Sequence, residues 1–92
     1  MSDVFAALAH PARRKILNLL RKGAMSAGDL AAHFDLAKPT LSGHFAMLKA
    51  ADLVTSERKG TTILYRLNMS VLEEAMAALM AIAGAKPPGD EP

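Results

Sequence analysis

The sequence contains no cysteine, and only 4% of its residues are aromatic. Without cysteine the chain can form no disulfide, supply no thiolate nucleophile and build none of the thiolate-rich sites that hold zinc or iron–sulfur clusters. Apolar residues make up 51% of the chain, and they are mostly alanine, leucine and methionine, which favour helices over a β-sandwich. The 92 residues therefore predict one helix-rich domain.

Long hydrophobic runs are also missing. No apolar stretch approaches the roughly 20 residues that a membrane-spanning helix needs. The N-terminus lacks the basic start and apolar run of a secretory signal. We therefore expect a cytoplasmic chain without membrane insertion.

Positive charge is distributed unevenly. Residues 1–66 hold ten Lys or Arg against five Asp or Glu, whereas residues 67–92 hold one Lys against four acids. A basic body of this kind suits contact with a nucleic acid. Taken alone, the pattern fits scattered solvated charges equally well.

Caps and apolar spacing predict two short helices at the start of the chain. Ser2 can cap the first, with Asp3 in its opening turn, where the helix dipole favours an acid. His10 ends this helix. Pro11 suits the first position of the second helix, and Gly23 is a natural stop for it.

Two further helices and a hairpin are expected next. Ser26 is the expected N-cap of a short helix that ends near Phe34, and a longer helix covers about 38–51. The apolar residues that turn this longer helix toward the core are Leu41, Phe45 and Leu48. Residues 53–58 and 62–67 favour extended chain with Gly60 between them, which predicts a two-stranded wing.

A last helix is expected from the capping box of Ser70 and Glu73 to about Gly84. Its residues 75–83 are apolar on every side, so one face should meet the domain and another a second subunit. We expect the domain to span residues 1–84. Residues 85–92 are rich in Pro and Gly and charged, which predicts a disordered tail.

This order of elements predicts an α+β, mainly α, winged helix-turn-helix fold: five helices, with the hairpin between the fourth and the fifth. The outer side of the 38–51 helix is small and lightly polar, and can lie in a major groove. Thr40 and Ser42 are the best candidates for contact with bases, and Lys38 and His44 for contact with phosphates. The candidate DNA contacts on this helix are Lys38, Pro39, Thr40, Ser42, Gly43, His44 and Met47.

The wing tip offers cations and hydroxyls for phosphate or minor-groove contact. Its candidate contacts are Arg58, Lys59, Gly60, Thr61 and Thr62. The plainer interpretations are a solvent-facing helix side and a solvated hairpin tip. The charge run at residues 13–15 is interpreted mainly as a solvated face, with contact to the DNA backbone as the minority hypothesis.

No metal or catalytic site is predicted. His10, His33 and His44 lie on three different elements without a close Asp, Glu or His partner at i+3 or i+4. The chain has no Gly-rich phosphate loop and no nucleophile elbow, so we expect neither an enzyme nor a cofactor.

Four motifs together resemble the ArsR family of bacterial winged-helix repressors. They are HPARRKIL at residues 10–17, LAKPTLSGHF at 36–45, LV at 53–54 and RKG at 58–60. The match covers residues 3–83, and the chain looks closest to the metal-free, autorepressor branch of the family. The resemblance implies a homodimer that is joined through its first and last helices and represses transcription, often of its own operon. The candidate interface residues are Val4, Phe5, Leu8, Leu72, Met76, Leu79, Met80 and Ala83.

The chain also departs from the family pattern. Metal-sensing members carry thiolates in the helix at 26–34, or carboxylate and His ligands in the last helix, and this chain has neither set. Gly43 stands where relatives usually present His or Arg. Ala37 replaces the usual Ser cap of the recognition helix, a loss that costs about 0.5–2 kcal/mol.

Double-stranded operator DNA and a second copy of the chain are thus the expected partners. A small-molecule inducer, a sequestering membrane protein and simple autoregulation all fit the pattern. The competing hypothesis is a winged-helix protein-interaction module whose basic wing docks on an acidic protein.

Overall fold

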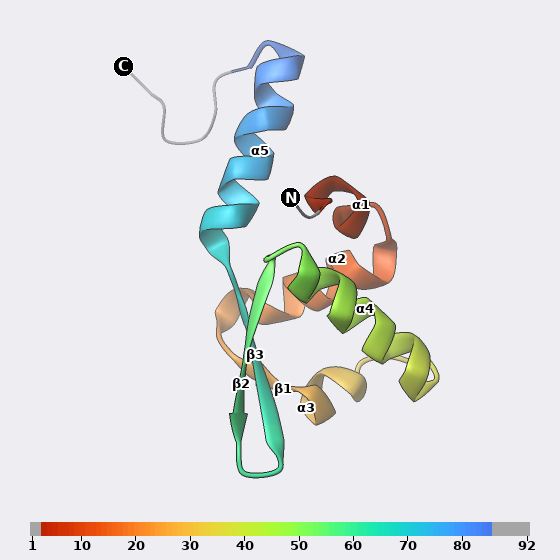
Figure 1. Cartoon of the computed structure of the whole chain (residues 1–92). Helices are drawn as coiled ribbons and strands as arrows, with labels where there is room; N and C mark the ends of the chain where they lie inside the picture. The colour runs from red at the N-terminus through yellow and green to blue at the C-terminus, as the bar shows by residue number, and fades with distance from the viewer. Residues whose placement is uncertain (1–2, 86–92) are drawn as a thin grey trace.

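The computed structural model describes residues 3–85 and has the predicted winged helix-turn-helix fold (Figure 1). In chain order its elements are α1 (Val4–Leu8), α2 (Pro11–Leu19), the 3-10 turn η1 (Leu20–Lys22), β1 (Met25–Ser26), α3 (Ala27–Ala31), α4 (Lys38–Ala50), β2 (Val54–Lys59), β3 (Thr62–Leu67) and α5 (Met69–Ala83). The described residues form five α-helices, and the β2–β3 hairpin lies between α4 and α5, as expected. No helix within the described residues is both long and apolar enough to cross a membrane.

The first two helices begin at side-chain caps. Asp3 is the N-cap of α1, and its Oδ1 accepts from the amide of Ala6 at 2.9 Å. The expectation of Ser2 as this cap is therefore wrong, because the helix starts one residue later. His10 caps α2 through Nδ1, and Pro11 takes the first helical position as predicted.

The helix-turn-helix unit is built from α3 and α4. Ser26 is the N-cap of α3, and its Oγ accepts from the amide of Asp29 at 3.0 Å, as predicted. The helix ends at Ala31 rather than near Phe34. Lys38 begins α4, which stops at Ala50, one residue short of the expected end.

The sheet has one strand more than expected. Strand β1 pairs antiparallel with β3, so the strand order is β1-β3-β2. In the hairpin, Lys59 pairs with Thr62, and Gly60 takes the turn with a φ of 62°, a left-handed conformation that favours glycine. The two-residue strand β1 attaches the start of α3 to the base of the wing.

The start of α5 differs from the prediction. Its N-cap is Asn68, which makes no side-chain capping bond, and Ser70 is the second residue of the helix. The amide of Asn68 donates to the carbonyl of Leu53 at 2.9 Å, so β3 leads directly into the helix and the expected Ser70 cap is wrong. Gly84 ends the helix in a left-handed conformation. Apart from Ala85, the expected tail lies outside the described residues.

The core joins α4 to the wing. Leu41, Phe45 and Leu48 are buried, as predicted. The ring of Phe45 stacks on that of Tyr65 in β3, with centroids 4.7 Å apart. The helix and the wing are therefore fixed to each other by direct packing, whereas α5 runs out from the body (Figure 1).

Candidate nucleic-acid interface

The outer side of α4 is exposed along its whole length. Six of the seven predicted contact residues are exposed, and of these Pro39 and Gly43 lie opposite the buried stripe of Leu41, Phe45 and Leu48. All six have exposed side chains or, at Gly43, an exposed backbone: Lys38, Pro39, Thr40, Ser42, Gly43 and Met47. No heavy atom lies within 4 Å of the position that a Cβ at Gly43 would occupy, so another body can approach the backbone there.

His44 is the exception on this helix. It is only 9% exposed, and its Nδ1 lies 3.1 Å from a guanidinium nitrogen of Arg13. Its ring also contacts that of His10, with centroids 4.5 Å apart. Position 44 follows Leu41 by three residues and precedes Leu48 by four, so it belongs to the buried stripe. The expected phosphate contact of His44 is therefore not supported.

The wing carries its cations at its free end. Arg58, Lys59, Gly60, Thr61 and Thr62 are all exposed. Arg66 lies 4.0 Å from Glu57 in an exposed ion pair, the kind that contributes little to stability. Within residues 3–85, neither Arg58 nor Lys59 has a carboxylate partner, so both charges are available to an external anion.

The three cations at residues 13–15 do not form a simple solvated face, because each side chain donates a hydrogen bond to a backbone carbonyl. Arg13 donates to carbonyl oxygens of α1, and Arg14 donates to the carbonyl of Leu8 at 2.9 Å. Lys15 donates to the carbonyl of His33 at 2.6 Å, and its ammonium group lies 4.6 Å from the centroid of the Phe34 ring. These three side chains bind α2 to its neighbours, a role that the sequence did not indicate.

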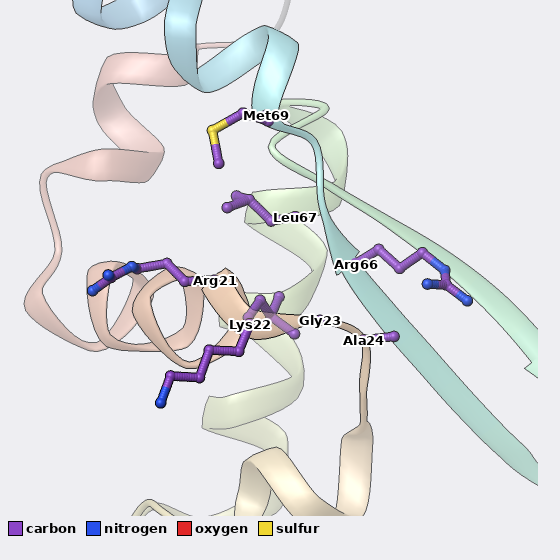
Figure 2. A pocket seen from close by; sticks show the side chains of 8 residues that line it. Arg21, Lys22, Gly23, Ala24, Arg66, Leu67 and Met69 are labelled. Atoms are coloured by element: carbon purple, nitrogen blue, oxygen red, sulfur yellow. The ribbon is translucent and has the colours of Figure 1, made fainter.

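A hollow of about 280 Å³ lies next to η1 and β3, and its cationic lining raises the question of anion binding. Three cations line it, Arg21, Lys22 and Arg66. Figure 2 shows their side chains pointing in different directions, away from a common centre. Among the described residues there is also no group of three His, Asp or Glu that could hold a metal ion.

A second exposed surface is apolar and lies on α1 and α5. Its large exposed side chains are Phe5 at 47%, Met76 at 38%, Leu79 at 51% and Ile82 at 84%. The other expected interface residues are half-buried, namely Val4, Leu8, Leu72 and Met80, or exposed, as Ala83 is. A hollow of about 600 Å³ between α1 and α5 adjoins this surface. Ile82 was not predicted, although it is the most exposed large apolar side chain in the part of the chain that the structure describes.

Comparison with known proteins places this geometry in a family. The model of the bacterial regulatory protein arsR family matches residues 10–56. The chain is 47% identical over 76 residues to transcriptional repressor SdpR of Bacillus subtilis (strain 168), covering 83% of this chain and 84% of that protein. It is 38% identical over 73 residues to the arsenical resistance operon repressor of Staphylococcus xylosus, covering 79% and 70%.

Solved structures give the same result. A possible transcriptional regulator for arsenical resistance superimposes with a TM-score of 0.82 at 32% identity, covering 89% of this chain and 85% of that one. NolR from Sinorhizobium fredii superimposes with a TM-score of 0.67 at 38% identity, covering 88% and 81%. The chain therefore belongs to the ArsR family of bacterial regulatory proteins, and it is a winged helix-turn-helix, DNA-binding transcriptional repressor rather than an enzyme.

Proposed function

We propose that the chain is a homodimeric autorepressor that binds an inverted-repeat operator through α4 and the wing of each subunit. The observation that carries the proposal is the separation of two surfaces. In Figure 1 the wing tip and the first residues of α4 lie toward one end of the molecule, and the free end of α5 lies toward the other. One surface is basic and polar and the other apolar, so DNA and a second subunit can bind at once.

The contacts with DNA divide into two kinds. Thr40 and Ser42 are exposed on α4, and we expect them to contact base edges, because hydroxyls can bond to either donors or acceptors in the major groove. Lys38, Arg58 and Lys59 neutralise phosphates, which gives affinity for any sequence. In a symmetric dimer the two recognition helices would lie about 34–36 Å apart, in successive major grooves. Since chromosomal DNA lies in the bacterial cytoplasm, the same proposal puts the chain there.

Titration of double-stranded DNA at several salt concentrations tests this division. The specific probe is the DNA upstream of the chain's own gene, and the comparison is random DNA of equal length. Lys59→Ala should weaken binding to both and reduce the slope of log K against log salt by about 0.9 per subunit, or about 1.8 for the dimer. Thr40→Ala and Ser42→Ala should instead lower the ratio of the affinity for specific DNA to the affinity for random DNA.

Lys22→Ala is the matched control, because Lys22 is an exposed cation on η1, outside the proposed contact surface. It should leave the salt slope unchanged. Equal losses on both DNAs for Thr40→Ala, Ser42→Ala and Lys59→Ala would contradict the division of roles. No retention of upstream DNA at physiological salt would favour the protein-interaction alternative.

The dimer is proposed to form through the apolar surface of α1 and α5. Leu79 is 51% exposed on this surface, so Leu79→Glu should place a charge in the interface and yield monomers in sedimentation. Ala81→Glu is the matched control: Ala81 is also exposed on α5 but lies about 200° around the helix from Leu79. A dimer that survives Leu79→Glu would contradict the proposed interface, as would equal dissociation of both variants.

A further inference from the structure

The side chain of Arg13 connects three helices. From its position in α2, its Nε donates to the carbonyl of Ala7 at 2.8 Å, and its Nη2 donates to the carbonyl of Ala6 at 3.0 Å. The remaining guanidinium nitrogen, Nη1, lies 3.1 Å from Nδ1 of His44 in the recognition helix. One residue therefore links α1, which carries part of the proposed dimer surface, to α4, which carries the DNA contacts.

The chemistry of the guanidinium fixes the state of the imidazole. Arginine has only donors, so Nδ1 of His44 must accept, and the ring must be neutral with its proton on Nε2. The neighbouring ring of His10 accepts from the amide of Ala12 through its Nδ1 at 3.1 Å. The two rings stand 4.5 Å apart, beside the guanidinium.

The surroundings of His44 oppose a second positive charge. Burial, then His10, then Arg13 hold the pKa of His44 below its usual value. The elements packed against α4 include α1, α2, β2 and, through the contact of Tyr65 with Phe45, β3. Of the titratable and charged groups on these elements in the described chain, only Arg13 acts on His44, together with His10 from the link between α1 and α2. Within residues 3–85, no carboxylate acts on His44 to stabilise an imidazolium.

We propose that Arg13 is a positioning residue that fixes the recognition helix against α1 through the neutral ring of His44, and that protonation of His44 breaks this link and lowers operator affinity. A protonated ring would turn an N–H toward the guanidinium, so two cationic donors would face each other without an acceptor. Helix α4 would then lose a lateral support, and its N-terminus has no side-chain cap to compensate.

The sign of the pH effect makes this inference testable. A histidine that gains a proton ordinarily strengthens binding to DNA, because it adds a positive charge near a polyanion. The link predicts the opposite for His44. The inference rests on the proposed operator binding, so its test must separate the failure of the link from the failure of that function.

The experiment measures the affinity of the full chain for its own upstream DNA from pH 7.5 to pH 5.5 at constant ionic strength. We expect wild-type affinity to fall about tenfold, the effect of losing one charge-assisted hydrogen bond that is coupled to binding. His44→Gln keeps an acceptor for Arg13 but does not titrate, so its affinity should stay near that of the wild type at pH 7.5 and should not fall on acidification. His33→Gln, which changes an exposed histidine next to α3, should keep the wild-type profile.

Arg13→Gln and Arg14→Gln form a matched pair. Each removes a guanidinium that donates to a carbonyl of α1, but only Arg13 reaches α4. Arg13→Gln should weaken operator binding about tenfold at pH 7.5 and flatten the dependence of affinity on pH. Arg14→Gln should keep the wild-type dependence. If Arg13→Gln proves unfolded by circular dichroism, the profile of His44→Gln decides alone.

Each outcome bears on the inference. A wild-type affinity that rises on acidification, or the same profile in wild type and His44→Gln, would overturn the link while leaving operator binding intact. Loss of operator binding in all proteins at every pH would instead overturn the proposed function, and the link with it.

Discussion

The recognition helix begins without a side-chain cap, and a single hydroxyl should supply one. Ala37 is the N-cap of α4, with φ −61° and ψ 146°, and it makes no side-chain capping bond. Ser26, the N-cap of α3, has φ −71° and ψ 157°, and its Oγ accepts from the amide three residues later. Because the two backbones are alike, Ala37→Ser should adopt the same cap without rearrangement.

The size of the effect follows from the first turn of α4. Pro39 has no N–H, and the amide of Leu41 already donates to the carbonyl of Ala37 at 3.0 Å. The amide of Thr40 is therefore the donor from which the new hydroxyl oxygen at position 37 would accept. A Ser cap in place of Ala contributes about 0.5–2 kcal/mol. Ala37 is exposed, so no packing is lost, and a gain of about 1 kcal/mol should raise Tm by about 4–8 °C in a domain of this size.

Thermal unfolding followed by circular dichroism measures this gain, at one fixed protein concentration because Tm depends on concentration in a dimer. Ala46→Ser is the control: it adds the same hydroxyl to an exposed position inside α4, where serine is a poorer helix former and should cost about 0.5 kcal/mol. An unchanged Tm for Ala37→Ser would refute the conclusion that α4 lacks a cap it can use. A rise in both variants would show a general effect of serine.

Two further predictions concern α4. Gly43→Ala should raise the free energy of unfolding by about 0.5–1 kcal/mol in urea titrations, because a helical glycine is entropically costly and nothing lies within 4 Å of the added Cβ; a loss of stability would show a hidden contact. The depressed pKa of His44 means that the folded chain binds fewer protons than the unfolded one. The contribution of neutral His44 to the free energy of unfolding should be complete above about pH 6.5 and should decline as the pH falls through the folded-state pKa. Urea titrations of His44→Gln should not show this decline.

Local rules were sufficient for most of the fold. Pro11, Ser26 and Gly84 each end or begin a helix through backbone and side-chain geometry within a few residues, so they were predicted correctly. Strand β1 was missed because its two residues carry no pattern of their own and exist as a strand only through pairing with β3. The Ser70 cap failed for a similar reason, since the pairing of Asn68 with Leu53 begins α5 earlier.

The exposure of the proposed contact residues was predictable because three strong apolar residues fix the orientation of α4 on a helical wheel. The apolar surface of α5 was only partly predictable. The apolar character of residues 75–83 and the family resemblance led to Leu79 and Met76. The exposure of Ile82 depends on where the domain body stops, and α5 extends beyond the body (Figure 1). Tertiary structure, not periodicity, therefore decides how far that surface extends.

His44 shows where residue type misleads. A polar residue on a DNA-binding helix suggests an outward role, but its spacing from Leu41 and Leu48 puts it in the buried stripe, and Arg13 supplies the partner that makes burial tolerable. No periodicity connects positions 13 and 44.

Helix α4 is held at its flank, by Arg13 on one element and Tyr65 on another, rather than by a cap at its N-terminus. A recognition helix held in this way depends on contacts with α2 and β3, so its orientation can respond to changes far from the DNA surface.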